Sequence, residues 1–162
     1  AHNKLEWIMP ADVNYRFLRY PVTTYQNFDF SIDVRKENLH LRYLLEPADK
    51  EDDRNLVPHL RAGAMAMHLA SNEEDSYVAA HQLDPARVDS VYQADWAQTF
   101  FFQPKDAFSL SPHCQMTAIY REGVAMAYIF LLFEEAPANL AAYAENLRFR
   151  PRLLRDSSLY RG

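Results

Sequence analysis

Ten successive apolar residues, Val124–Phe133, stand in the last third of the chain. In an extended strand, alternate side chains point to opposite faces of the sheet. One face would carry Val124, Met126, Tyr128, Phe130 and Leu132, and the other Ala125, Ala127, Ile129, Leu131 and Phe133. An antiparallel strand with one face in water alternates apolar with polar residues, so we expect this strand to be central and covered on both sides.

The flanking segments turn this strand into a larger unit. Gln115–Arg121 predicts a strand that joins Val124–Phe133 through a turn at Glu122-Gly123. Pro137–Leu147 predicts a short helix, and Leu147-Arg148-Phe149 predicts a last short strand.

Further strands and a helix precede this unit. Phe28–Arg35 alternates apolar and polar residues, and Leu39–Leu45 returns after a turn. Asn55–Ser71 predicts a helix that lies on the sheet and covers one face of Val124–Phe133, alone or with Pro137–Leu147. The apolar stripe expected on this helix consists of Leu56, Val57, Leu60, Ala64, Met67 and Leu69. The other face needs a second layer, the apolar N-terminal segment or a partner chain.

Two more strands are predicted at Tyr77–Leu83 and Trp96–Phe102, while Ala86–Ala94 is ambiguous between a helical turn and an irregular connection. The chain is therefore expected to form one α+β domain over residues 1–162, with an antiparallel sheet of about six strands flanked by helices. Residues 152–162 are expected to form a flexible basic tail.

Composition excludes several function classes. The chain has three glycines, too few and too scattered for a phosphate-cradling loop or a dinucleotide fold, and no cofactor is expected. The net charge of −5 disfavours a nucleic-acid surface. Cys114 is the only cysteine, which excludes an intrachain disulfide, and no apolar run is long enough for a transmembrane helix.

The chain begins with Ala1-His2 rather than Met. This start fits a mature exported protein that has lost its signal peptide, or a truncated or tagged chain. A periplasmic or secreted location is slightly favoured over a cytoplasmic one.

The order of the C-terminal elements resembles that of PsbP-like domains, which include bacterial DcrB-type lipoproteins and a eukaryotic Ran-binding import factor. The resemblance is carried by Tyr120-Arg121-Glu122-Gly123, the apolar strand after it, the helix led by Pro137, and Leu147-Arg148-Phe149. It implies an antiparallel sheet between helices and a non-enzymatic adaptor role, often outside the bacterial cytoplasm. No functional residue is carried over from the family.

Residues that could carry chemistry are few. His113-Cys114 is the best nucleophile candidate, but neighbours on a strand point to opposite faces, which favours an inert buried cysteine. None of the six histidines has metal-site spacing, and no metal site or catalytic residue is predicted. Asp49, Glu51 and Asp53 lack the later ligands of a calcium loop. Glu134-Glu135 would complement the dipole of a helix that starts at Pro137.

Two function classes follow from this pattern. The first is a non-catalytic binding or scaffold domain that contacts a protein partner or itself. The alternative is a small-ligand carrier or an enzyme with an apolar cavity between helix and sheet. The residues predicted to form the ligand or partner surface are Tyr43, Tyr77, Trp96, Phe100 and Tyr128.

Overall fold

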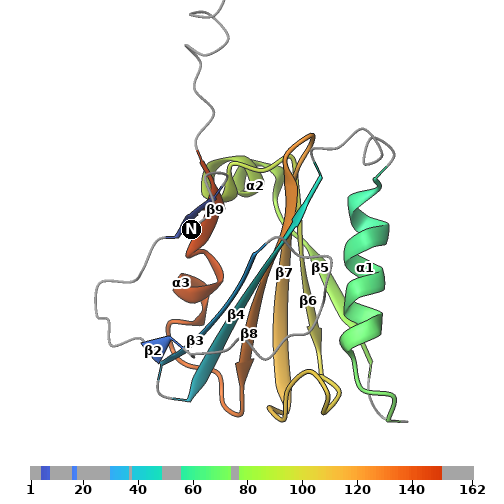
Figure 1. The fold of residues 1–162 in the computed structure, drawn as a ribbon, viewed down its shortest axis with the longest axis vertical. Helices are drawn as coiled ribbons and strands as arrows, with labels where there is room; N and C mark the ends of the chain where they lie inside the picture. Colours follow the sequence, from blue (N-terminus) through green and yellow to red (C-terminus); the bar gives the residue numbers. More distant parts are fainter. Residues whose placement is uncertain are drawn as a thin grey trace, which may run out of the picture.

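The structure is a computed structural model that describes residues 5–7, 16–17, 30–36, 38–48, 56–73 and 77–150. Its main feature is a seven-stranded antiparallel sheet in the order β2-β3-β4-β8-β7-β6-β5 (Figure 1). The strands are β2 (Arg16–Phe17), β3 (Phe30–Lys36), β4 (Leu39–Pro47), β5 (Ala79–Gln82), β6 (Trp96–Phe102), β7 (His113–Arg121) and β8 (Ala125–Phe133). A separate pair joins β1 (Leu5–Trp7) to β9 (Leu147–Phe149).

Strand β8 lies near the middle of the sheet, between β4 and β7, and all nine of its residues are buried. Its side chains divide between two hydrophobic clusters. One cluster, on what we call the α1 face, includes Met126, Tyr128 and Phe130. The other, on the α2 face, includes Ile129 and Leu131. The predicted central strand with two covered faces is therefore confirmed.

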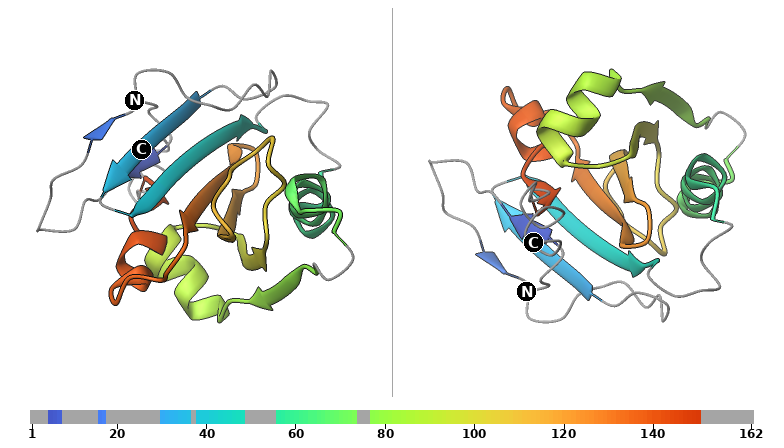
Figure 2. Two further views of the ribbon diagram at one scale, coloured as in Figure 1. Left: turned by 90° about the horizontal axis from the view of Figure 1, so that it is seen from below. Right: turned by 90° about the horizontal axis from the view of Figure 1, so that it is seen from above.

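The two covers come from different parts of the chain. The α1 face packs against α1 (Pro58–Leu69). The α2 face packs against α2 (Pro85–Tyr92), α3 (Leu140–Ala144) and β9. Figure 2 shows α1 on the opposite side of the sheet from α2 and α3. The second layer is thus supplied by the chain itself, and α3 does not join α1 as the sequence suggested.

Helix α2 occupies the segment that the sequence left ambiguous. The side chain of Asp84 accepts a hydrogen bond from the backbone N–H of Ala86, and Pro85 stands in the first turn, where it needs no N–H partner. The helix ends at Gln93, whose φ of 53° is left-handed. Val88 and Tyr92 lie one turn apart and are both buried against the sheet.

Helix α1 faces the sheet with a different side from the one predicted. Its buried residues are Ala62, Ala66 and Leu69, whereas Leu60 is 62% exposed and Met67 is 67% exposed. The large side chains of β6 and β7, such as Phe100 and Met116, fill the space under the helix, so small alanines fit there. The stripe of larger residues faces outward, and only its members Leu56 and Leu69 reach the core.

The predicted α+β class, with an antiparallel sheet flanked by helices, is confirmed. In the part of the chain that the structure describes, no helix is both long and apolar enough to cross a membrane. The predicted basic tail at 152–162 lies outside the described residues.

Candidate functional site

Strand β5 forms one edge of the sheet. Among the described strands it pairs only with β6, and three of its four residues are exposed. Native sheets usually protect such edges with charged residues, proline or bulges. The sequence of β5, Ala79-Ala80-His81-Gln82, contains no proline and no acidic or strongly basic residue. The opposite edge strand, β2, is only two residues long. Of the two described edge strands, β5 therefore offers the longer stretch of main chain to another strand.

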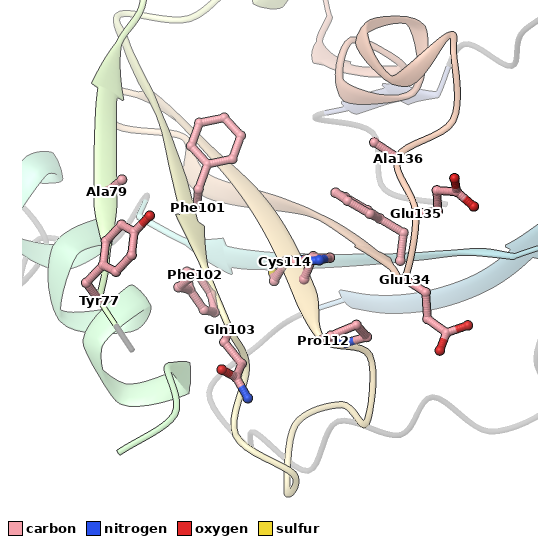
Figure 3. Close-up of a pocket in the computed structure, with 12 residues that line it drawn as sticks. Tyr77, Ala79, Phe101, Phe102, Gln103, Pro112, Cys114, Glu134, Glu135 and Ala136 are labelled. Atoms are coloured by element: carbon pink, nitrogen blue, oxygen red, sulfur yellow. The ribbon is translucent and has the colours of Figure 1, made fainter. Parts of the chain in front are cut away.

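A hollow of about 580 Å³ opens beside this edge, where β5, β6, β7 and β8 reach the same end of the sheet (Figure 3). Its size is within the range of about 300–1,000 Å³ that ligand sites occupy. It is lined by Tyr77, Ala79, Phe101, Phe102, Gln103, Pro112, His113, Cys114, Phe133, Glu134, Glu135 and Ala136.

Aromatic side chains dominate the lining of this hollow. Tyr77 is 77% exposed and Phe101 is 37% exposed, which is high for such large apolar groups. The ring of His81 meets Phe101 edge-on at a centroid distance of 5.3 Å. The ring of His113 lies 5.7 Å from that of Phe133. The hollow is thus an accessible aromatic surface rather than a sealed part of the core.

The charged groups of the hollow lie on one side. Figure 3 shows Glu134 and Glu135 on the side opposite Tyr77, with their carboxylates extending outward. Neither lysine nor arginine is among the twelve lining residues. The rim is therefore negative next to an apolar floor.

A second hollow, of about 620 Å³, lies on the α1 face beside the loop 103–112. Its lining mixes Arg35, His40 and Arg42 with Asp106 and Glu134. Arg42 is 1% exposed and donates a 2.7 Å hydrogen bond to the carbonyl oxygen of Phe108. The deepest cation of this hollow is therefore engaged in holding the loop on the sheet.

Cys114 has the environment of a structural residue. It is fully buried on the α1 face, whereas His113 is exposed and stacks near Phe133 on the other face. Burial raises the pKa of the Cys114 thiol well above its ordinary value, and the positive charge of Arg42 offsets this only in part. The pair does not form an activated nucleophile, because His113 lies on the other face and burial outweighs the effect of Arg42 on the thiol.

The five residues predicted to form a surface do not share one cavity. Tyr43 is buried on the α2 face, where its hydroxyl donates to Asn146 Oδ1 at 3.0 Å. Phe100 and Tyr128 are buried on the α1 face, and Trp96 packs against them half-buried. Only Tyr77 lines the aromatic hollow. The five predicted residues do not include Phe101, His113 or Phe133, which line the hollow. Exposed members of Trp96–Phe102 were nevertheless expected to mark a pocket or partner surface, because three successive aromatics cannot all point to one face, and Phe101 is such a member.

The remaining residues that the sequence suggested for chemistry do not come together in one site. Glu134 and Glu135 are exposed after β8, but α3 begins at Leu140, so they do not flank a helix N-terminus as predicted. Within the described ranges, no three His, Cys, Asp or Glu side chains gather as metal ligands do. Asp49, Glu51 and Asp53 lie outside the described residues.

No family model, curated protein or solved structure matches this chain. The resemblance to PsbP-like domains stays a prediction from element order.

Proposed function

We propose that this protein is a non-catalytic binding domain that recognises an extended segment of another protein by adding it as a strand to β5. The observation that carries the proposal is an unprotected edge strand that opens onto an aromatic hollow. The resemblance to PsbP-like domains, with its implied adaptor role, points the same way.

Strand addition explains the small residues of β5. The main chain of an added strand supplies hydrogen bonds, and its alternate side chains supply specificity through pockets. Ala79 is paired with Phe101 across β5 and β6, on the α2 face. Because Ala79 carries only a methyl group, a side chain of the added strand can pass over it and reach Phe101. The hollow then accepts that side chain or the residue that follows.

A segment of a different protein fits this edge better than a second copy of the chain. If two β5 strands paired about a two-fold axis they would run antiparallel, so Gln82 of one copy would lie toward the hollow of the other and the chain would turn away at Asp84-Pro85, where α2 begins. The acidic Asp84 of the second copy would then face a negative rim. A foreign segment with a longer side chain satisfies both the edge and the hollow.

Selection from a phage-displayed library of random dodecapeptides tests this proposal. The library is panned on the wild type, on Ala79→Lys and on Ala141→Lys. Ala79→Lys places a charge at the edge, whereas Ala141 is an exposed residue of α3 and provides the matched control. Circular dichroism and thermal unfolding establish that both variants fold.

The expected result is enrichment of β-prone peptides on the wild type and on Ala141→Lys, with loss of enrichment on Ala79→Lys. Equal enrichment on all three proteins, or none on any of them, would overturn the proposal. A small apolar molecule such as 8-anilinonaphthalene-1-sulfonate that binds the wild type where no peptide does would favour the ligand carrier instead.

A further inference from the structure

We infer that the segment bound at β5 carries a lysine or arginine a few residues C-terminal to its paired stretch, and that Glu134 and Glu135 recognise this charge. The inference rests on the proposed function and adds the chemistry and the direction of the partner.

The negative charge at the rim of the hollow favours a ligand that carries a positive charge. Glu134 and Glu135 are exposed at its rim, and the twelve lining residues include no Lys or Arg, while Glu134 also borders the second hollow, where Arg35 and Arg42 lie. The hollow is also lined by the titratable side chains of His113, Tyr77 and Cys114, and His81 lies against Phe101 beside it. A rim of one sign beside an apolar wall attracts ligands of the opposite sign and repels acidic ones.

The floor of the hollow suits the stem of a long basic side chain. Lys and Arg lay their methylene groups on apolar surface while the charged head stays in water. Phe101 and Phe133 supply that surface, and an aromatic face also attracts a nearby cation. The carboxylates extend outward at the rim, where such a charged head would emerge (Figure 3).

Distance gives the position of the basic residue. The added strand would lie one spacing outside β5, so four spacings of about 4.8 Å, roughly 19 Å, separate it from β8. A side chain of the paired stretch itself cannot cross that width. About four further residues, at about 3.3 Å each, bring the main chain far enough for a Lys or Arg side chain to reach the rim.

Strand direction decides which end of the segment carries it. Every pair in the main sheet is antiparallel, and antiparallel pairing outnumbers parallel pairing overall. The hollow lies at the Ala79 end of β5, which is its N-terminal end. An antiparallel partner runs toward that end with its C-terminus, so the basic residue follows the paired stretch.

Four peptide sub-libraries test the inference, three of them differing only in the residue at the end of a C-terminal flank. Each of these three has randomised paired positions followed by a fixed flank that ends in Arg, Gln or Glu, and the fourth carries the Arg flank at the N-terminus. They are panned on the wild type, on Glu134→Gln/Glu135→Gln and on Glu122→Gln. Glu122 is exposed in the β7–β8 turn, at the other end of the sheet, and is the matched control.

The expected result is that peptides with the C-terminal Arg flank bind the wild type and Glu122→Gln about 3- to 10-fold more tightly than those with Glu, measured by fluorescence anisotropy in about 50 mM salt. The difference should disappear in the double variant. If Ala79→Lys abolishes binding but the Arg, Gln and Glu flanks bind alike, the inference is wrong and the proposed function stands. If Ala79→Lys leaves binding of every sub-library unchanged, the proposed function falls as well.

Discussion

The guanidinium of Arg42 donates a 2.7 Å hydrogen bond to the carbonyl oxygen of Phe108 and lies 4.6 Å over the ring of the same residue. The Phe108 ring in turn meets Phe130 of β8 at 4.9 Å. A buried cation and a core aromatic thus hold the loop 103–112 on the α1 face. This loop covers the part of the face that lies beyond α1.

Replacement of Arg42 by methionine should destabilise the protein by about 1–3 kcal/mol, because the buried Phe108 carbonyl loses a charge-assisted donor and the ring loses a cation. Urea unfolding monitored by circular dichroism measures the change. Arg87→Met is the control, since Arg87 pairs with Glu145 at the surface, where such pairs contribute about 0–1 kcal/mol. Equal effects of the two substitutions would contradict the assigned role of Arg42.

Removal of the Tyr43 hydroxyl should also cost stability. Tyr43 and Asn146 are both buried, and Tyr43→Phe leaves the Asn146 oxygen without this donor, at a cost of about 1–3 kcal/mol. Tyr77→Phe makes the same chemical change at a tyrosine that is 77% exposed and should shift the urea midpoint very little. An unchanged free energy of unfolding in Tyr43→Phe would show that this hydrogen bond does not stabilise the folded state.

The thiol of Cys114 should be unreactive in the folded protein. Burial raises its pKa, so little thiolate forms at pH 8, and although Cys114 borders the aromatic hollow, only 2% of the residue is exposed to reagent. Reaction with 5,5′-dithiobis(2-nitrobenzoate) should be complete in urea and slow by orders of magnitude without it. Rapid labelling of the native protein would instead show that the Cys114 thiol is reactive in the folded state.

Alkaline pH should weaken the contribution of Tyr92. Burial raises its pKa to about 12 from an ordinary value of 10.0, with Arg87 opposing the shift, and its hydroxyl donates to the Ala144 carbonyl at 3.0 Å. Because the folded pKa is the higher one, the stabilisation is fully present below about pH 10 and is lost as the pH rises through about 12.

Comparison of the wild type with Tyr92→Phe by urea unfolding at pH 8 and pH 11 tests this sign. The wild type should be the more stable protein at pH 8, and its advantage should shrink at pH 11. An advantage that stays constant or grows would mean that the hydroxyl is not held neutral by burial.

Local patterns were sufficient to predict much of the main sheet. The alternation in Phe28–Arg35 and the unbroken apolar run of β8 depend only on the two-residue period of a strand, and that period holds wherever the strand lies. The same period correctly predicted that the side chains of His113 and Cys114 point to opposite faces of the sheet. The helical period did not predict the packing face of α1, because that helix carries apolar residues on two sides, and the sequence does not say which side meets the sheet.

The sequence by itself determined that β8 is buried on both faces, since no polar residue interrupts its ten-residue apolar run. Only the tertiary structure decided that α2 and α3 form the second cover, and that β5 ends the sheet beside an aromatic hollow. Strand order and the choice of packing face depend on contacts between residues far apart in the chain. Those contacts are selected by how all the elements pack together, which no single segment encodes.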